Sequence, residues 1–219
     1  MRSIFSCHRL TCCFRFVAIA TAEGSGFGAW TWRRARDEHT RAALRVLVGL
    51  LSDSYDRVDA TSAAVQALLG VGAEYLLHCG DLGSRRILDC FKGVAAGFVW
   101  GDHDRDRMGL LRYADALQIQ CFGVLGDFAL EDKRIAITHG DDRKLLKRLI
   151  REGQHDFILH GHVTEPRDQT EGRTHIISPG PLHGGPKRTV ALLDTSSGKV
   201  SVIPVATGVT REFRAFIAL

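Results

Sequence analysis

Three apolar stretches separated by segments of helical character constrain this chain to a parallel sheet with helices packed against it. The stretches cover residues 44–51, 75–79 and 94–100. Nearly continuous apolar runs of this length are typical of strands buried on both faces. Helices are predicted at 58–71, 84–91 and 107–117. This strand and helix alternation predicts right-handed crossovers between neighbouring parallel strands.

The second half of the chain predicts antiparallel strands as well. Residues 128–131 and 134–138 flank a short turn, a basic helix fits 143–151, and a strand fits 157–159. Further strands are predicted at 174–177, 189–194 and 200–205, separated by glycine-containing turns. We expect an α/β fold, a four-layer αββα sandwich of two mixed β-sheets flanked by helices. The basic residues of 143–151 are interpreted as a solvated helix face.

Charge separates the N-terminal stretch from the rest of the chain. Residues 1–45 hold eight arginines against three acidic residues, a net charge of +5, whereas the whole chain carries +4. The remainder is therefore close to −1, and no net basic surface favours a nucleic-acid partner. We predict that 1–43 is an N-terminal extension, disordered or outside the core, and that 44–219 is the folded domain. A targeting segment is the alternative for the extension.

Cysteine usage and hydropathy bear on the compartment. The six cysteines show no disulfide-like spacing, so reduced thiols and a cytoplasmic location are expected. The longest apolar run in the extension, 14–22, is shorter than the ~20 residues of a membrane span and contains Arg15. We therefore expect no association with a membrane.

Polar side chains follow nearly every predicted strand. One such residue alone would be ordinary turn chemistry or a solvated histidine. Repetition at the carboxyl edge, where α/β sheets bind ligands, predicts an enzyme site. Carboxylates mixed with imidazoles, without a cysteine cluster, suit a divalent ion such as Mn, Fe, Zn or Ni. The residues are Asp53, Asp81, Asp102, His103, Asp104, His139, His160 and His162.

Five blocks in order carry a resemblance to a known family. The chain resembles the calcineurin-like metallophosphoesterase superfamily, and is most similar to its small bacterial and archaeal phosphodiesterases. The resemblance implies that 44–219 is a metallophosphoesterase-like domain. The resemblance implies that Asp81 bridges two ions, that Asp53 binds the first, and that His139 and His162 bind the second. The blocks are Asp53-Ser54-Tyr55, Gly80-Asp81, Gly101-Asp102-His103-Asp104, His139-Gly140 and Gly161-His162-Val163-Thr164.

The Gly101-Asp102-His103-Asp104 block carries three further implied roles. Asp102 occupies the position of the family's asparagine and is expected to bind the second ion. His103 matches the family's imidazole near the leaving group, a candidate general acid. Asp104 beside it is expected to support the catalytic site.

Departures from the family pattern concern the first ion. The family's two other imidazoles are replaced by Tyr55 and Thr164, which leaves Asp53, Asp81 and at best a phenolate or a hydroxyl there. We therefore predict one well-bound divalent ion and a second, weak site.

Two functions compete on these observations. The first is a metal-dependent phosphoesterase, either a phosphodiesterase or a phosphatase, that hydrolyses a small-molecule phosphate ester with metal-activated water. The alternative is a catalytically impaired member of the fold that acts as a binding or scaffold protein. The two lost imidazoles favour the alternative, whereas His103, His139 and His162 favour the enzyme.

Overall fold

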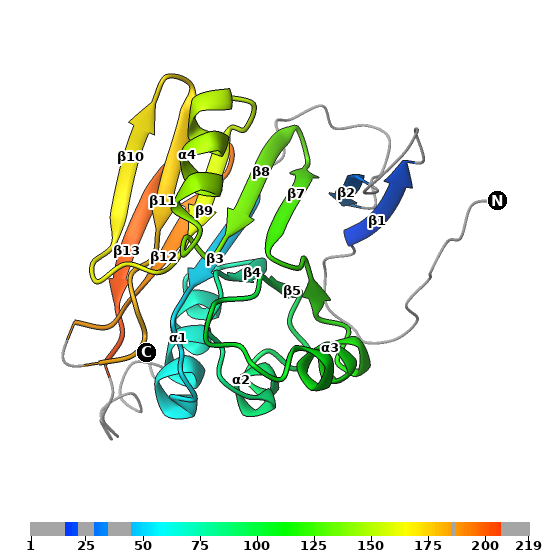
Figure 1. The fold of residues 1–219 in the computed structure, drawn as a ribbon, viewed down its shortest axis with the longest axis vertical. Coiled ribbons are helices and arrows are strands. Elements are labelled where there is room, and N and C mark those ends of the chain that lie inside the picture. The colour runs from blue at the N-terminus through cyan, green and yellow to red at the C-terminus, as the bar shows by residue number, and fades with distance from the viewer. Residues whose placement is uncertain (1–15, 22–28, 35–44, 185–186, 207–219) are drawn as a thin grey trace, which may run out of the picture.

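The computed structural model of the chain describes residues 16–21, 29–34, 45–184 and 187–206. Two mixed β-sheets lie face to face, three helices cover one side and a fourth helix covers the other (Figure 1). The predicted four-layer αββα arrangement is confirmed.

The six-stranded sheet holds the predicted parallel strands. Four parallel neighbours, β3 (Leu47–Leu51), β4 (Tyr75–His78), β5 (Ala96–Phe98) and β6 (Gln120–Cys121), are extended by antiparallel β12 (Thr189–Asp194) and β13 (Val200–Pro204). The strand order is β13-β12-β3-β4-β5-β6. Helices α1 (Val58–Gly70), α2 (Arg85–Asp89) and α3 (Arg107–Ala116) lie together on its outer side (Figure 1). Every β3 residue after Leu47 is buried, as expected for a strand covered on both faces.

The seven-stranded sheet mixes both pairing directions. Its strands are β1 (Phe16–Thr21), β2 (Ala29–Arg34), β7 (Leu125–Leu130), β8 (Lys133–Thr138), β9 (Phe157–His160), β10 (Arg167–Glu171) and β11 (Thr174–Ser178). They are ordered β1-β2-β7-β8-β9-β11-β10. Strands β8, β9 and β11 are parallel, and α4 (Arg143–Glu152) connects β8 to β9 as a crossover helix.

Three apolar clusters separate the four layers. One lies between α1, α2, α3 and the six-stranded sheet, and includes Leu68, Leu88 and Phe98. A second lies between the two sheets and includes Leu50 and Ile137. The third packs α4 on the seven-stranded sheet. Because each sheet has an apolar contact on both faces, its strand ends are held rigidly, which is what a site built on those ends requires.

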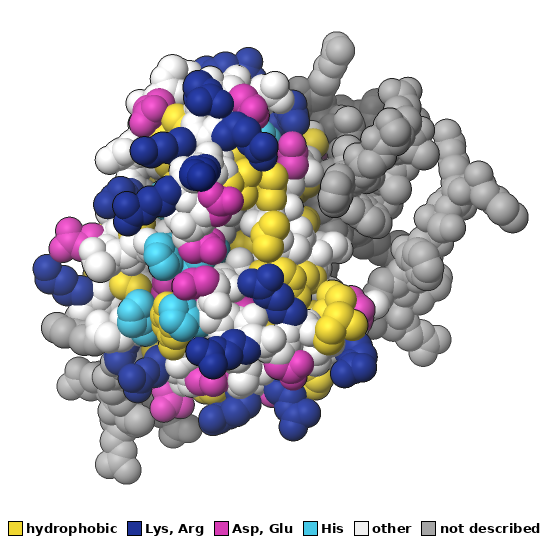
Figure 2. All heavy atoms as spheres, viewed as in Figure 1, with side chains coloured by type: hydrophobic (Ala, Val, Ile, Leu, Met, Phe, Trp, Pro, Cys, Tyr) yellow, Lys and Arg dark blue, Asp and Glu magenta, His cyan; other side chains and the backbone are white. Residues whose placement is uncertain are grey.

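Helix α4 is strongly amphipathic. Leu149 is buried against the sheet, whereas the lysines and arginines of α4 are exposed. Figure 2 shows basic side chains gathered on this part of the surface. The solvated basic face predicted for 143–151 is confirmed.

Four strands were not predicted. Strands β1 and β2 fall inside the predicted extension and pair with each other, and β2 pairs with β7 in parallel. Their backbone pairing extends an edge of the sheet. All five residues of β10 are exposed and β6 has only two residues, so neither leaves a periodic signal. The rest of the predicted extension 1–43, residue 44 and the terminal residues 207–219 lie outside the described residues, and the division into an extension and a domain stays a prediction.

None of the helices in the described ranges has the length and apolar character that crossing a membrane requires. Cys79, Cys90 and Cys121 carry free thiols.

Candidate metal centre

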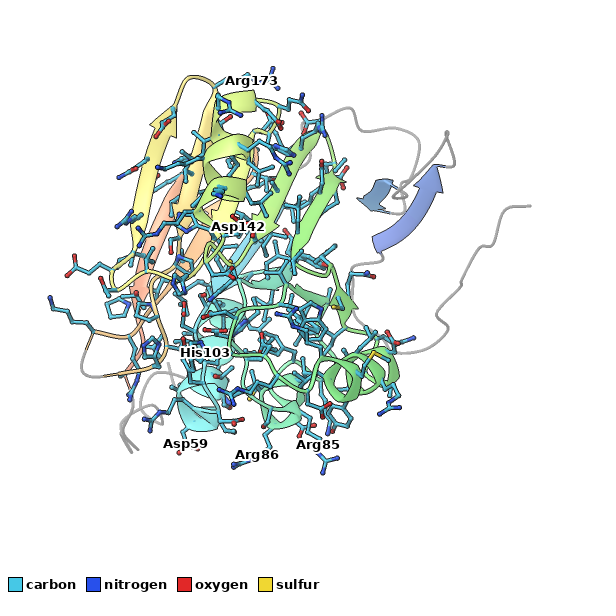
Figure 3. All side chains as sticks on the ribbon, viewed as in Figure 1. Asp59, Arg85, Arg86, His103, Asp142 and Arg173 are labelled. Atoms are coloured by element: carbon cyan, nitrogen blue, oxygen red, sulfur yellow. The ribbon has the colours of Figure 1, made fainter. Side chains whose placement is uncertain are left out.

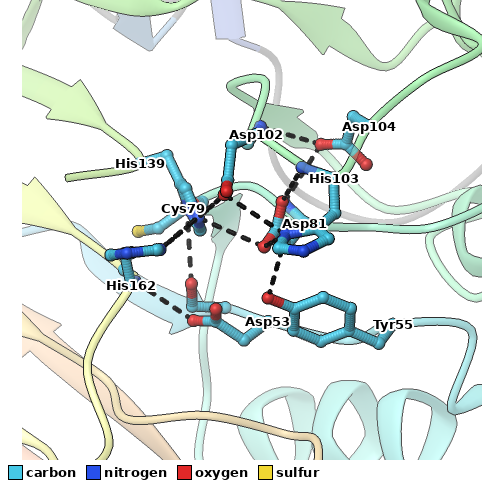
Figure 4. Close-up of polar contacts among 12 residues, drawn as sticks. Asp53, Tyr55, Cys79, Asp81, Asp102, His103, Asp104, His139 and His162 are labelled. Carbon is cyan, nitrogen blue, oxygen red and sulfur yellow. Dashed lines mark hydrogen bonds and ion pairs between the residues drawn. The ribbon is translucent and has the colours of Figure 1, made fainter. Parts of the chain in front are cut away.

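The polar strand ends meet at one edge of the molecule. Strands β3, β4 and β5 of one sheet, and β8 and β9 of the other, all end there, and their following residues converge (Figure 4). Figure 2 shows the histidine and acidic side chains gathered on this face. Asp53, Asp81 and His162 have φ values of 55°, 59° and 54°. Left-handed backbone is unfavourable for non-glycine residues and is concentrated at functional sites.

Four side chains form a compact cluster of possible ligands. Asp81, Asp102, His139 and His162 each offer an atom, and the four atoms lie within 4.8 Å of one another. His139 Nε2 is 3.3 Å from both Asp81 Oδ2 and Asp102 Oδ1. His162 Nδ1 is 3.2 Å from His139 Nε2 and 3.7 Å from Asp102 Oδ1. These are the residues that the resemblance assigned to the second ion.

The hydrogen bonding of His139 leaves one nitrogen for a cation. Its Nδ1 lies 2.7 Å from the Cys79 carbonyl oxygen, which can only accept, so Nδ1 carries a proton and donates. Nε2 then faces two carboxylates. Burial opposes protonation, but the hydrogen bond with Asp81 and the Cys79 carbonyl raise the pKa of His139 to about 9. A metal ion and a proton therefore compete for Nε2, as is usual at metal sites.

Asp81 is the most connected carboxylate of the cluster. It is fully buried. Burial raises its pKa, but hydrogen bonds with His139, Tyr55 and the His103 backbone outweigh burial and lower the pKa of Asp81 well below its usual range. Its Oδ1 accepts from the His103 amide at 2.9 Å, and its Oδ2 is 3.1 Å from His103 Nδ1. Asp81 is therefore a permanent anion facing three imidazole or phenol groups.

Asp104 holds the backbone that carries Asp81. The Asp104 carboxylate is 2% exposed and accepts from the amides of Gly101 at 2.8 Å, Asp81 at 3.0 Å and Gly83 at 3.1 Å. Burial raises the pKa of Asp104, and the three amide hydrogen bonds oppose that rise. Each of these three hydrogen bonds goes to a main-chain amide, so the Asp104 carboxylate holds the backbone of the loops that carry Asp81 and Gly101.

Gly101 lets these two loops approach each other. A Cβ atom at position 101 would lie 2.0 Å from Asp81 Oδ1 and 2.5 Å from the Asp81 amide nitrogen. No side chain fits that space, so glycine is required there by contact with Asp81 rather than by its own backbone conformation.

His103 lies at the solvent side of the cluster, with 52% of its side chain exposed. The hydrogen bond to the Asp81 carboxylate raises the pKa of His103, which favours its protonated form. Tyr55 Oη lies 3.4 Å from His103 Nδ1. The geometry suits a proton donor at the mouth of the site.

Asp53 lies beside the four-residue cluster and is not part of it. Its Oδ2 accepts from the His162 amide at 3.3 Å, and burial raises its pKa. Burial and the Asp81 carboxylate also raise the pKa of Tyr55, which disfavours a phenolate. Thr164 is exposed, and among the described residues no hydrogen bond joins it to Asp53. The predicted first-ion residues are therefore less closely gathered than those of the second.

Three features of the site were missed or left unassigned from sequence. His183 packs edge-on against Tyr55 with ring centroids 4.5 Å apart, and its Nδ1 is 3.3 Å from the Asp53 carbonyl oxygen. His78 Nε2 lies 2.8 Å from Ser54 Oγ in a buried contact. Arg107 donates to the carbonyl oxygens of Asp104 and Gly101. Only tertiary contact identifies them, although His183 directly precedes the predicted turn Gly184-Gly185.

The donor set fits a divalent cation. Two imidazole nitrogens and two carboxylate oxygens are the ligands that ions such as Mn, Fe, Zn or Ni accept. A cation also compensates the negative charge that the two carboxylates bring close together. His160 does not join the cluster, because its Nδ1 bonds the Gly161 carbonyl.

Comparisons with known proteins agree with this geometry. The profile of the calcineurin-like phosphoesterase superfamily domain matches residues 46–198. The chain is 26% identical over 157 residues to Phosphodiesterase MJ0936 of Methanocaldococcus jannaschii, which covers 68% of this chain and 92% of that protein.

Solved structures share the fold. One, described as a novel archaeal phosphodiesterase, superimposes with a TM-score of 0.68 at 22% identity, over 73% of this chain and 99% of that one. The phosphoesterase Yfce of E. coli gives a TM-score of 0.52 at 15% identity, over 74% of this chain and 100% of that one.

Proposed function

The chain belongs to the calcineurin-like phosphoesterase superfamily, and on this premise we propose that it is a metal-dependent hydrolase of small-molecule phosphate esters. The observation that carries the proposal is the cluster of Asp81, Asp102, His139 and His162, whose ligand atoms lie within 4.8 Å of one another. A phosphodiesterase is favoured over a phosphatase because the relative from Methanocaldococcus jannaschii is named a phosphodiesterase.

The four clustered residues would hold the well-bound ion. Their mixed nitrogen and oxygen donors support Mn, Fe, Zn or Ni. When bound, such an ion supplies Lewis acidity to the phosphoryl group and favours deprotonation of the attacking water. The buried Nδ1–H of His139, fixed by the Cys79 carbonyl, keeps Nε2 directed at the ion position.

The remaining residues prepare the substrate and the leaving group. His103 is exposed at the mouth and hydrogen-bonded to Asp81, so it can carry a proton to the departing oxygen. Asp104 keeps the amides of Asp81 and Gly101 in place. The substrate phosphate would lie between the ligand cluster and His103.

We further propose that the second ion position, next to Asp53, is weak. Tyr55 stands where the family has histidine, and burial and Asp81 hold it as a neutral phenol. Thr164 is exposed, and in the part of the chain that the structure describes it makes no hydrogen bond with Asp53. Asp53 therefore lacks the imidazole partners that a tight second site needs.

Hydrolysis of bis-p-nitrophenyl phosphate tests the proposal. The protein is expected to release p-nitrophenolate with manganese or nickel, and Asp81→Asn to lower the rate at least ~100-fold, since it removes a ligand. Asp115→Asn, an exposed carboxylate on α3, is the matched control and retains the rate. Elemental analysis is expected to find nearer one ion than two per chain. No turnover with any divalent ion would overturn the enzyme proposal.

The scaffold alternative is favoured by one observation, the replacement of two imidazoles by Tyr55 and Thr164. It predicts an ion bound without turnover. The double variant Tyr55→His with Thr164→His addresses the weak site directly, and we expect it to raise both metal content and rate. Unchanged metal content and rate would show that these positions do not limit the site.

A further inference from the structure

A cavity lined by three arginines lies beside the candidate metal centre. Its volume is about 310 Å³, and Arg57, Arg86 and Arg188 line it together with the start of helix α1. Arg57 directly precedes α1, Arg86 lies on α2, and Arg188 directly precedes β12. Figure 3 shows Arg86 and Asp59 at the outer end of these helices, on the same side of the molecule as His103. Three segments distant in sequence thus bring their guanidinium groups to one cavity.

The charge of the cavity wall favours an anion. Two carboxylates, Asp56 and Asp59, also line it, but Asp56 is hydrogen-bonded to Ser84 Oγ. The N-terminal end of helix α1, residues Val58, Asp59 and Ala60, lines the same cavity, and the positive end of the helix dipole adds to the potential of the arginines. Arginine is the side chain best suited to phosphate, because its planar fork donates two parallel hydrogen bonds.

The cavity and the metal centre share one loop. Tyr55 contacts His103 through its hydroxyl, and the next residue, Asp56, lines the cavity. Only Ser54 and Tyr55 lie between Asp53 and Asp56, so three steps along the chain place the two Cα atoms at most about 11 Å apart. The Asp53 side of the metal centre and the arginine-lined cavity therefore lie within a distance that one small molecule can span.

We propose that this cavity binds a second phosphate group of the substrate, so that the preferred substrates are phosphate esters that carry another phosphate on the same molecule. The inference rests on the proposed function and assigns its substrate class. Free inorganic phosphate has the same chemistry as this second group and is the other possible occupant. A second phosphate of the substrate would make hydrolysis selective for esters that carry it, whereas free phosphate would not.

A matched pair of substrates separates them. Thymidine 5′-(p-nitrophenyl phosphate) and the same compound with a 3′-phosphate release the same leaving group and differ only in the second phosphate. We expect the 3′-phosphate to raise kcat/KM at least tenfold, and the double variant Arg57→Gln with Arg86→Gln to reduce that ratio to about threefold or less, since two charge-assisted contacts are lost. Arg85→Gln is the control, because Arg85 neighbours Arg86 on α2, is exposed and does not line the cavity.

Binding supplies a readout that needs no turnover. Calorimetry compares thymidine 3′,5′-bisphosphate with thymidine 5′-phosphate on the wild-type chain, the double variant and Arg85→Gln, after thermal unfolding has shown that all three fold. Tighter binding of the bisphosphate that depends on Arg57 and Arg86 supports the proposal even if no substrate is hydrolysed, in which case only the proposed activity fails.

Two results overturn the proposal. The first is a selectivity ratio and a bisphosphate affinity that the double variant leaves unchanged. The second is arginine-dependent binding of inorganic phosphate with no effect of the 3′-phosphate on kcat/KM, which would assign the cavity to free phosphate.

Discussion

The substitution Asp104→Asn tests whether a residue that hydrogen-bonds the backbone of the metal-centre loops determines the geometry of the metal centre. Asp104 Oδ2 accepts from the amides of Gly101 and Asp81, and Oδ1 accepts from the amide of Gly83. An asparagine can place its carbonyl oxygen at the Oδ2 position and keep two of these bonds. Its NH₂ group then faces the Gly83 amide, donor against donor.

The expected cost follows from this count of bonds. One hydrogen bond to a charged acceptor, worth about 1.5–3 kcal/mol, is lost, and the other two weaken as the acceptor becomes neutral. Burial disfavours the charged form, as the raised pKa of Asp104 indicates, so removal of the charge offsets part of the loss. We expect the free energy of unfolding to fall by about 2–3 kcal/mol.

The assay pairs stability with metal affinity. Urea unfolding gives the change in free energy, and a metal titration gives the dissociation constant of the centre. Because the Asp81 amide is one of the released groups, Asp81 shifts and metal binding weakens by about tenfold or more. Asp106→Asn is the control: Asp106 is an exposed cap of α3 that accepts from the Gly109 amide at 3.0 Å, so about 1 kcal/mol or less is lost and metal affinity is retained.

Wild-type stability and metal affinity in Asp104→Asn would refute this reasoning. Equal loss of metal affinity in Asp106→Asn would also refute it, because the effect would then come from general loosening of the fold.

Three further predictions concern packing, pH and proton transfer. Gly101→Ala forces a Cβ atom to within 2.0 Å of Asp81 and is expected to lower the free energy of unfolding by about 1–3 kcal/mol and to weaken metal binding. In the control Gly70→Ala the new Cβ atom meets no atom within 4 Å, so stability and metal binding are retained. Comparable urea midpoints for the two variants would contradict this prediction. Burial lowers the pKa of His78 from 6.5 to about 3, so the unfolded chain binds the proton first and stability falls as pH drops below 6.5. Between pH 7.5 and pH 5 this residue lowers the free energy of unfolding by about 2 kcal/mol. In urea titrations at the two pH values, His78→Gln should remove that difference. His103→Gln is expected to lower the rate about 10²-fold or more for phenyl esters and much less for p-nitrophenyl esters, whose leaving group needs no proton; equal losses for both esters would exclude His103 as the acid.

The fold class could be predicted because local pattern and burial coincide in its central elements. Strands β3 and β4 lie between two apolar layers, so their sequences are apolar throughout and could be identified without any structure. Strand β10 has five exposed residues, and its place is decided by backbone pairing with β11. Strands β1 and β2 add to a sheet edge through β7; the apolar run 14–22 that contains β1 was interpreted as part of an extension, so its strand was missed.

The ligand cluster was predicted for a related reason. Strands that run parallel deliver the residues after their carboxyl ends to one edge, which was enough to expect polar side chains together there. The grouping of Asp81, Asp102, His139 and His162 around one ion was implied by the family resemblance. The structure adds the roles that depend on distance: the tautomer of His139, set by the Cys79 carbonyl, and the separation of Asp53 from the cluster.

By itself the sequence predicted the two-sheet architecture and carboxylates and imidazoles at the strand ends, because burial periodicity and strand ends are local properties. The family resemblance added which of these residues group around one ion. Only the tertiary structure decided what surrounds that cluster. The meeting of Arg57, Arg86 and Arg188 at one cavity and the contact of Gly101 with Asp81 join segments far apart in the chain. Such contacts depend on how the loops pack, and no local pattern encodes that packing.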